Sequence, residues 1–185
     1  MKQDLRFEKT EKAIQKAFFE LLQQKDMAKI SVKEICELAQ ISRNAFYQHY
    51  ETKEHLYDSL LQHILISIEK ACRPLVKDMT SITDVERRLF LDNILFAVHQ
   101  NRFIIYQLLS NQPAVFSAAF KEMLISAMCL STIQLNGLPN LYYIHVFAGG
   151  IVAFVNYWLL ETSDTLEEAQ DQLFLLLGQL NLPNR

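Results

Sequence analysis

The side chains that most directly suggest chemistry in this sequence are the polar ones of a short segment, residues 42–48. Arg43 has the forked donor geometry that pairs with guanine, while Asn44 and Gln48 carry amides of the kind that pair with adenine. Ser42 adds a hydroxyl, a group that binds phosphate oxygens. These residue types can bind nucleic acid if the fold holds them where they can reach it.

An enzyme is the competing class of function, and the sequence offers little for it. It has no closely spaced His and Cys of the metal-ligand type, no H-E-x-x-H motif, no nucleophile elbow and no phosphate-binding loop. Lone histidines such as His99 and His145 are more often core residues than catalysts. We therefore predict no catalytic residue, no metal site and no cofactor.

The distribution of glycine predicts an all-α fold. All four glycines, Gly137, Gly149, Gly150 and Gly178, lie in the last third of the chain. Dinucleotide folds, phosphate loops and tight hairpins need glycine where the backbone takes positive φ or approaches a ligand. The first 136 residues cannot form these structures in their usual way.

Four helices are predicted in the first 72 residues. An apolar stripe runs along a helix from about Glu8 to Lys25. Ser31 is placed to cap a second helix with Glu34 at the capping-box position, and Ser42 to cap a third that ends near Tyr47. Thr52 opens a fourth helix that runs to about Cys72.

The second and third helices are short and are joined by the residues Ala39-Gln40-Ile41-Ser42. Their length and inward-facing apolar residues are typical of a helix-turn-helix, which sets its second helix into the major groove of DNA. The pattern thus indicates a DNA-binding motif.

The segment ISVKEICELAQISRNAFYQHYETKEHL, residues 30–56, resembles the head of the TetR family, and the similarity extends over about residues 8–61. The family has a hydroxyl residue at the start of helix 2, an A-G-V-S turn, a recognition helix ending in an aromatic pair, and a Lys-Glu at the start of helix 4. Gln40 stands where the family usually has the turn glycine, a position that other residues can occupy at modest cost.

The resemblance implies a role in DNA binding for eight residues. Four are implied to hold phosphates, namely Ser31, Tyr47, His49 and Lys53. Four are implied to lie near base edges, namely Ser42, Arg43, Asn44 and Gln48. For Tyr47 and His49 the alternative is that they only cover the core of the head. Residues 1–60 hold ten basic and ten acidic residues, so binding must rely on local placement of charge.

We predict a helix-turn-helix DNA-binding domain at residues 1–60 and a helical ligand-binding and dimerisation domain at residues 61–185. Apolar periodicity and prolines predict the helices of the second domain at about residues 82–100, 102–110, 114–135, 141–161 and 166–180. Loops are expected at residues 111–113 and 136–140. TetR-family bodies are implied to bind ligands and to dimerise through their last two helices.

A homodimer face is predicted on those two helices, since four such helices from two chains would form one bundle. The candidate residues are Phe147, Gly150, Ile151, Phe154, Trp158, Leu173 and Leu177. The alternative is that these apolar stripes close the core of a monomer. A helix-turn-helix that reads half-sites about one DNA turn apart favours the dimer.

A ligand pocket is predicted from aromatic and methionine side chains with few polar groups, a lining that suits a small apolar or aromatic effector. The candidates are Phe96, His99, Phe103, Tyr106, Phe116, Phe120, Met123, Met128, Tyr142, His145 and Asn156. Plain core packing is the alternative for each of them.

The predicted function is a sequence-specific transcriptional regulator, a repressor that leaves a near-palindromic operator when a small molecule binds. A DNA-bound activator or adaptor controlled by a protein partner is the alternative. Cys36, Cys72 and Cys129 are far apart, which favours a cytoplasmic protein without disulfides. The uncharged run Leu141–Leu160 is long enough for a membrane span, but it lacks flanking cations, and a buried helix is expected instead.

Overall fold

The computed structural model describes residues 2–72, 83–134 and 140–178, and every described element is helical. The chain divides into two compact units, residues 1–63 and 64–185. The boundary falls within one continuous helix, α4 (Lys53–Cys72), so this helix contributes residues to both units.

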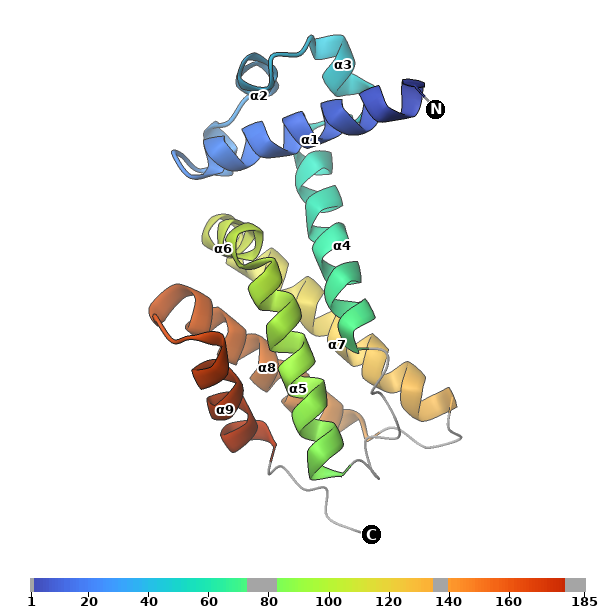
Figure 1. The fold of residues 1–185 in the computed structure, drawn as a ribbon, viewed down its shortest axis with the longest axis vertical. Helices are drawn as coiled ribbons and strands as arrows, with labels where there is room; N and C mark the ends of the chain where they lie inside the picture. The colour runs from blue at the N-terminus through green and yellow to red at the C-terminus, as the bar shows by residue number, and fades with distance from the viewer. Residues whose placement is uncertain (1, 73–82, 135–139, 179–185) are drawn as a thin grey trace. The chain divides into compact units, whose positions relative to one another are not determined.

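Unit 1 contains α1 (Lys2–Leu22), a short 3-10 helix η1 (Met27–Lys29), α2 (Val32–Ala39), α3 (Arg43–Tyr47) and the first turns of α4. Helix α1 packs against α2 (Figure 1). It supplies the predicted apolar stripe, in which Ile14 and Phe18 are fully buried. From the shorter helices, Ile35 and Phe46 enter the same core without exposed surface. Burial of these apolar side chains is what holds such short helices in place.

The turn between α2 and α3 carries the one backbone departure of the described residues. Gln40 has φ 56° and ψ 44°, and it is the non-glycine residue with positive φ in that part of the chain. Its N–H donates to the carbonyls of Cys36 and Glu37, and the Ile41 N–H donates to the Cys36 carbonyl at 3.0 Å. The left-handed conformation closes α2 as a glycine would, although a side chain makes it less favourable.

Unit 2 contains the rest of α4 together with α5 (Asp84–Gln100), α6 (Arg102–Asn111), α7 (Pro113–Gln134), α8 (Leu141–Glu161) and α9 (Leu166–Leu177). Helix α8 packs along α7 and also contacts α6 and α9, while α5 packs on α9 (Figure 1). The interior is apolar and rich in aromatic rings, with Phe90, Phe116, Phe120, Phe147 and Trp158 fully or almost fully buried.

Two helices of unit 2 are long and apolar enough to cross a membrane, judged by length and composition alone. They are the window Pro113–Leu130 and the helix Leu141–Glu161, with mean hydropathies of 1.4 and 1.5. This is weak evidence, because core helices of soluble proteins pass the same test. Phe147, Ile151 and Val155 of α8 are fully buried against the rest of the unit.

The predicted all-α fold is confirmed, and most helix boundaries agree within two residues. The first helix is an exception, since it begins six residues before the predicted Glu8 and ends at Leu22. Its first two turns are polar on most sides, so no apolar period marked them. The predicted loop at residues 111–113 is reduced to Gln112. The predicted loop at residues 136–139 and the predicted helix ends at Ile82, Leu135 and Leu180 lie outside the described residues.

Replacing Gln40 by glycine should stabilise unit 1, because glycine adopts positive φ without a steric cost. We expect Gln40→Gly to raise the free energy of unfolding by about 0.5–1 kcal/mol, after allowing for the greater freedom of glycine in the unfolded chain. Urea denaturation followed by far-UV circular dichroism measures it. Gln40→Ala keeps a side chain and is the control; equal stability of the two variants would contradict the argument.

Candidate nucleic-acid interface

The recognition element is α3, a helix of five residues whose position depends on one buried side chain and one cap. Phe46 is fully buried in the core of unit 1. Ser42 has extended backbone geometry, and its Oγ accepts a hydrogen bond from the Ala45 N–H at 3.1 Å, as an N-cap residue does. With Phe46 turned inward, the opposite side of the helix is directed to solvent.

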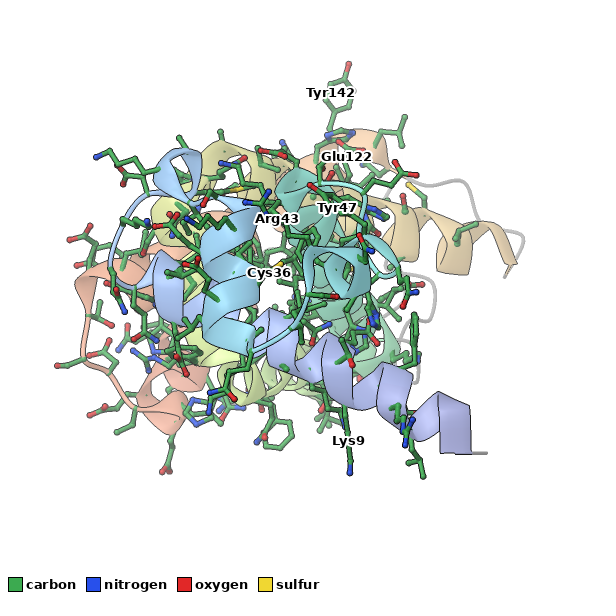
Figure 2. The ribbon with its side chains drawn as sticks, turned by 90° about the horizontal axis from the view of Figure 1, so that it is seen from above. Lys9, Cys36, Arg43, Tyr47, Glu122 and Tyr142 are labelled. Atoms are coloured by element: carbon green, nitrogen blue, oxygen red, sulfur yellow. The ribbon has the colours of Figure 1, made fainter. Side chains whose placement is uncertain are left out.

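The exposed side of α3 carries four of the predicted DNA-binding residues. Arg43, Asn44, Tyr47 and Gln48 are all exposed, and the Tyr47 side chain is 54% exposed although it is a large aromatic residue. Figure 2 shows Arg43 and Tyr47 extending from α3 on the face of unit 1 that is seen from above. One cation, two amides and one phenol therefore share one helix face.

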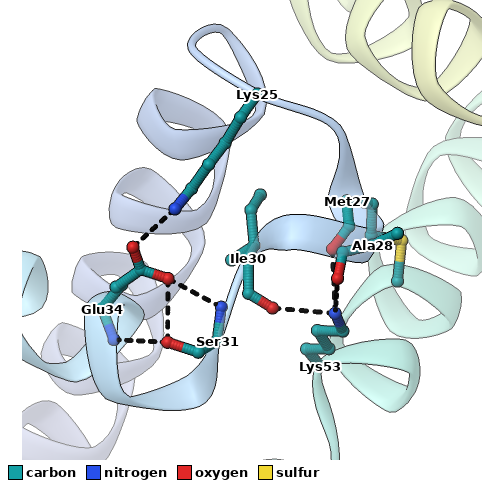
Figure 3. Close-up of polar contacts among 7 residues, drawn as sticks. All are labelled: Lys25, Met27, Ala28, Ile30, Ser31, Glu34 and Lys53. Carbon is teal, nitrogen blue, oxygen red and sulfur yellow. Dashed lines mark hydrogen bonds and ion pairs between the residues drawn. The ribbon is translucent and has the colours of Figure 1, made fainter.

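Ser31 is engaged at the start of α2. Its Oγ donates to Glu34 Oε2 at 2.8 Å and accepts from the Glu34 N–H at 3.3 Å, which completes the predicted capping box (Figure 3). Lys25 Nζ lies 2.5 Å from Glu34 Oε1. The hydrogen bonds from Lys25 and Ser31 lower the pKa of Glu34 to about 2. This contribution to stability is present above the ordinary carboxyl pKa and is lost as the pH falls towards 2.

Lys53 has three protein acceptors for its ammonium group. Its Nζ donates to the carbonyl oxygens of Met27 at 2.9 Å, Ala28 at 3.2 Å and Ile30 at 2.7 Å (Figure 3). The side chain is only 18% exposed. An ammonium has three donors, so all three are used inside unit 1. Lys53 thus ties the start of α4 to the segment that precedes α2.

The structure gives Ser31 and Lys53 partners within unit 1, and their phosphate contacts stay predictions. Both were predicted to hold phosphates, but in this structure the Ser31 hydroxyl donates to a carboxylate and the Lys53 ammonium to three carbonyls. The sequence pattern placed both residues correctly at helix starts. It could not show which acceptor each side chain would meet, because those acceptors come from elsewhere in the unit.

His49 is partly buried beside the first helix. Its ring stacks on Phe7 of α1, with ring centroids 3.8 Å apart and planes inclined by 29°. Burial lowers the pKa of His49, and nearby Glu11 opposes this effect. Glu11 also accepts a hydrogen bond from the Tyr50 hydroxyl at 3.1 Å. Phe7 was missed by the sequence analysis, since the predicted first helix began one residue later, at Glu8, whereas α1 begins at Lys2.

The predicted pocket residues divide between the interior and the surface of unit 2. Phe120 is fully buried and Met123 partly buried, but Phe96, His99, Phe103 and Tyr106 are exposed. The Tyr142 side chain is 90% exposed and extends into solvent (Figure 2). Tyr142 therefore does not line a pocket in this structure. The cause is that aromatic residues occupy exposed as well as buried faces of α5, α6 and α8.

Asn156 is the polar member of the predicted pocket with a defined partner. Its Nδ2 donates to the Ser117 Oγ at 2.8 Å, which links α8 to α7. Its Oδ1 is enclosed and has no hydrogen-bond partner. A buried acceptor without a donor is unfavourable, so this oxygen is the unsatisfied polar atom of the Asn156–Ser117 pair.

The predicted dimer residues also need correction. Phe147, Ile151, Trp158 and Leu173 are buried within the single chain, so their side chains cannot contact a second copy in this conformation. A methyl group on Gly150 would lie 2.9 Å from Leu177 Cδ2, so these two residues pack against each other instead. Phe154 remains partly exposed.

Other apolar residues of the same two helices are exposed. On α8 they lie at helical spacing, and on α9 they are adjacent; together they are Val146, Ala153, Tyr157, Leu160, Leu175 and Leu176. We call this set the α8–α9 surface. Gly149 borders it, and a methyl group there would meet only the Lys121 Cε at 4.0 Å. The surface is apolar and has room for a second backbone to approach closely.

Comparison with known proteins gives the family. Residues 14–60 match the family described as bacterial regulatory proteins, tetR family. The chain is 27% identical over 167 residues to the uncharacterized HTH-type transcriptional regulator YxbF of Bacillus subtilis (strain 168), with 89% of this chain aligned. It spans only 43% of the length of that relative.

Solved structures agree over nearly the whole chain. A TetR transcriptional regulator from Streptococcus agalactiae 2603V is 25% identical, with a TM-score of 0.65 and coverage of 96% of this chain and 98% of that one. The TetR-family repressor FadR of Thermus thermophilus, solved in complex with lauroyl-CoA, shares the fold, with 21% identity, a TM-score of 0.53 and coverage of 95% and 98%.

The fold and the exposed face of α3 define a helix-turn-helix protein with an all-helical body. The matched residues 14–60 include α2, the turn and α3. Residues 14–60 thus match the TetR family of bacterial regulatory proteins, and the chain has the fold of the solved TetR-family regulators.

Removing the Lys53 ammonium should destabilise unit 1. Lys53→Met keeps most of the apolar stem but removes a donor from three carbonyls, of which that of Met27 still accepts from the Ile30 N–H at 3.1 Å, so we expect a loss of about 1–3 kcal/mol in the free energy of unfolding. Far-UV circular dichroism in urea measures it. Lys33→Met removes an exposed lysine 3.7 Å from Glu37 and should change stability by less than about 0.5 kcal/mol. Equal effects of the two variants would contradict the role assigned to Lys53.

Proposed function

We propose that this chain is a sequence-specific DNA-binding repressor that acts as a homodimer in the cytoplasm and leaves its operator when a small molecule binds. The observation that carries the proposal is the exposed face of α3, where Arg43, Asn44 and Gln48 stand over a fully buried Phe46. Arginine pairs with guanine through two donors, and the amides pair with adenine in the same way. A rigid helix presents them together.

Phosphate contacts would fix the position of α3 on the duplex. We assign them to the Tyr47 hydroxyl and to His49, while the Ser42 hydroxyl, whose hydrogen remains available as its oxygen caps the helix, is placed near the base edges. Lys53 and Ser31 act behind this face by holding η1 and α2. Basic and acidic residues balance in residues 1–60, so affinity should fall less steeply with salt than it does for a strongly basic protein.

The α8–α9 surface is the proposed contact between two copies. Its members are exposed and apolar in the single chain, and Gly149 and Ala153 allow close approach of a second helix. A two-fold axis brings the same surface of both copies together. Two heads related by that axis would match the two halves of a near-palindromic operator.

An effector site is proposed in unit 2 beside Asn156 and Ser117, where a ligand with a hydrogen-bond donor could satisfy the enclosed Oδ1. The lauroyl-CoA complex of the related-fold repressor FadR supports a small-molecule effector in general. Helix α4 has residues in both units, so a shift of this helix on effector binding would change the packing of unit 1 as well as that of unit 2. Effector and DNA would then weaken each other's binding by the same factor.

The proposal is tested by selecting duplexes from a pool of genomic DNA fragments with the purified chain at a stated salt concentration. We expect recovery of a near-palindromic sequence, and loss of its gel shift with at least one member of a metabolite panel. Recovery of no preferred sequence would refute sequence-specific binding. A palindrome that every metabolite leaves bound would count against release by a small molecule.

Arg43→Ala should weaken binding to the recovered duplex by about 10- to 100-fold, as expected when a bidentate base contact is lost. Binding to a random duplex of equal length should change less, because base contacts carry the specificity. Lys16→Ala is the control, since Lys16 is an exposed cation on α1, near Glu20 at 3.8 Å. Equal losses for the two variants, or for the two duplexes, would remove Arg43 from base recognition.

Ala153→Glu should convert the dimer to a monomer, because it places a charge in the middle of the apolar α8–α9 surface. Ala153 is exposed in the single chain, so the protomer should keep its fold. Sedimentation velocity at micromolar concentration measures the change, with Val85→Glu, at a 70% exposed site on α5, as the control. A variant that sediments as the wild type does would place the contact elsewhere.

A further inference from the structure

The histidine at the edge of the recognition helix is packed against a residue of α1 that no part of the proposed function uses. Phe7 lies at 3.8 Å from the His49 ring, centroid to centroid, in a stacked arrangement. Phe7 itself is 47% exposed. One of its faces therefore covers the imidazole while the rest meets solvent.

The two ring nitrogens of His49 have different surroundings. Nδ1 is enclosed and has no hydrogen-bond partner. An N–H enclosed without an acceptor loses its hydrogen bond to water, whereas a bare nitrogen lone pair is less costly to enclose. In the neutral ring the proton should therefore be on Nε2, which makes Nε2 the donor and Nδ1 the unused acceptor.

The charge of Glu11 favours a protonated imidazole, so the ring is neutral only if its enclosure has the larger effect. Glu11 of α1 attracts a proton to the ring, and the adjacent Tyr50 hydroxyl already donates to the Glu11 carboxylate at 3.1 Å. Gln15 also donates to the Tyr50 oxygen, at 3.2 Å. Glu11 is thus partly satisfied by its own partner, and enclosure of the ring, to which Phe7 contributes, has the larger effect on His49.

We propose that Phe7 is a positioning residue for DNA binding: its ring fixes His49 in the Nε2–H tautomer, so that a neutral imidazole donates one hydrogen bond to a DNA phosphate. The inference rests on the proposed function, because it assigns the donor atom within that same interface. A neutral donor contributes a hydrogen bond without releasing a counterion. Loss of His49 at pH 7.5 should therefore lower affinity and leave the salt dependence unchanged.

The tautomer is measured without DNA, on the full chain labelled with ¹⁵N-histidine. Long-range ¹H–¹⁵N correlation spectra at pH 7.5 distinguish Nδ1–H from Nε2–H, and His49→Gln identifies the signal. We expect His49 to be in the Nε2–H form. In Phe7→Ala both tautomers should appear, and the pKa of His49 should rise towards its ordinary value because the ring is more solvated.

The DNA measurement uses the duplex recovered by the selection experiment. Phe7→Ala and His49→Gln should each weaken binding by about three- to tenfold, and the double variant should be no weaker than His49→Gln alone. Phe7→Tyr keeps the stacked ring and should restore both the tautomer and the affinity. Leu5→Ala, at a second exposed apolar position two residues earlier on α1, is the control and should change neither.

Three results would overturn the proposal. An unchanged tautomer in Phe7→Ala would show that Phe7 does not position the ring. A changed tautomer with unchanged affinity would separate the ring state from binding. A reduced salt slope in His49→Gln would show a charged contact instead of a neutral one. If the wild-type chain binds no DNA, the proposed function fails and the phosphate contact with it, whereas the tautomer spectra still decide whether Phe7 fixes the ring.

Discussion

Burial of Phe46 is the constraint on which the candidate interface depends. A helix of five residues has too few internal hydrogen bonds to persist alone, so α3 exists because Phe46 is anchored in the core of unit 1 and Ser42 caps the first turn. The same anchoring sets which side chains face outward. Arg43, Asn44 and Gln48 are displayed because the other side of the helix is fixed, which limits the conformational entropy that binding must overcome.

The polar residues behind α3 hold the frame in which it is placed. Lys53 joins the start of α4 to three carbonyls before α2, and Glu34 joins Lys25 to the Ser31 cap. Residues 1–60 hold ten basic and ten acidic residues, and these contacts show that some of the charged side chains stabilise the fold of unit 1. Some of its cations serve the fold, so the remaining exposed ones determine where DNA can bind.

The sequence predicted the order of helices in unit 1 because the signals for their caps and apolar faces are local. Caps at Ser31 and Ser42 and a hydrophobic period in α1 act over three or four residues, and the structure has each of them. Helix α8 is different, since it is apolar on every side and its period does not distinguish a buried from an exposed face. That is why Phe147 and Trp158 were predicted at a dimer face and are buried, while Val146 and Tyr157 are exposed. The role of Phe7 could not be predicted in this way, because it depends on a contact with His49, 42 positions later in the chain, and no local pattern encodes that contact.

The near balance of charge in unit 1 gives each uncharged contact more weight. A strongly basic head gains most of its affinity from counterion release, which is independent of sequence and weakens with salt. A head whose charges balance gains less from counterion release, so placed hydrogen bonds contribute a larger share of its affinity, and they contribute most when the donors are ordered before DNA binds. The anchored Phe46, the three acceptors of Lys53 and the Phe7–His49 stack all reduce motion of this kind. On this argument rigidity of the head replaces charge as the source of its affinity, and specificity follows because a rigid donor set fits few duplexes.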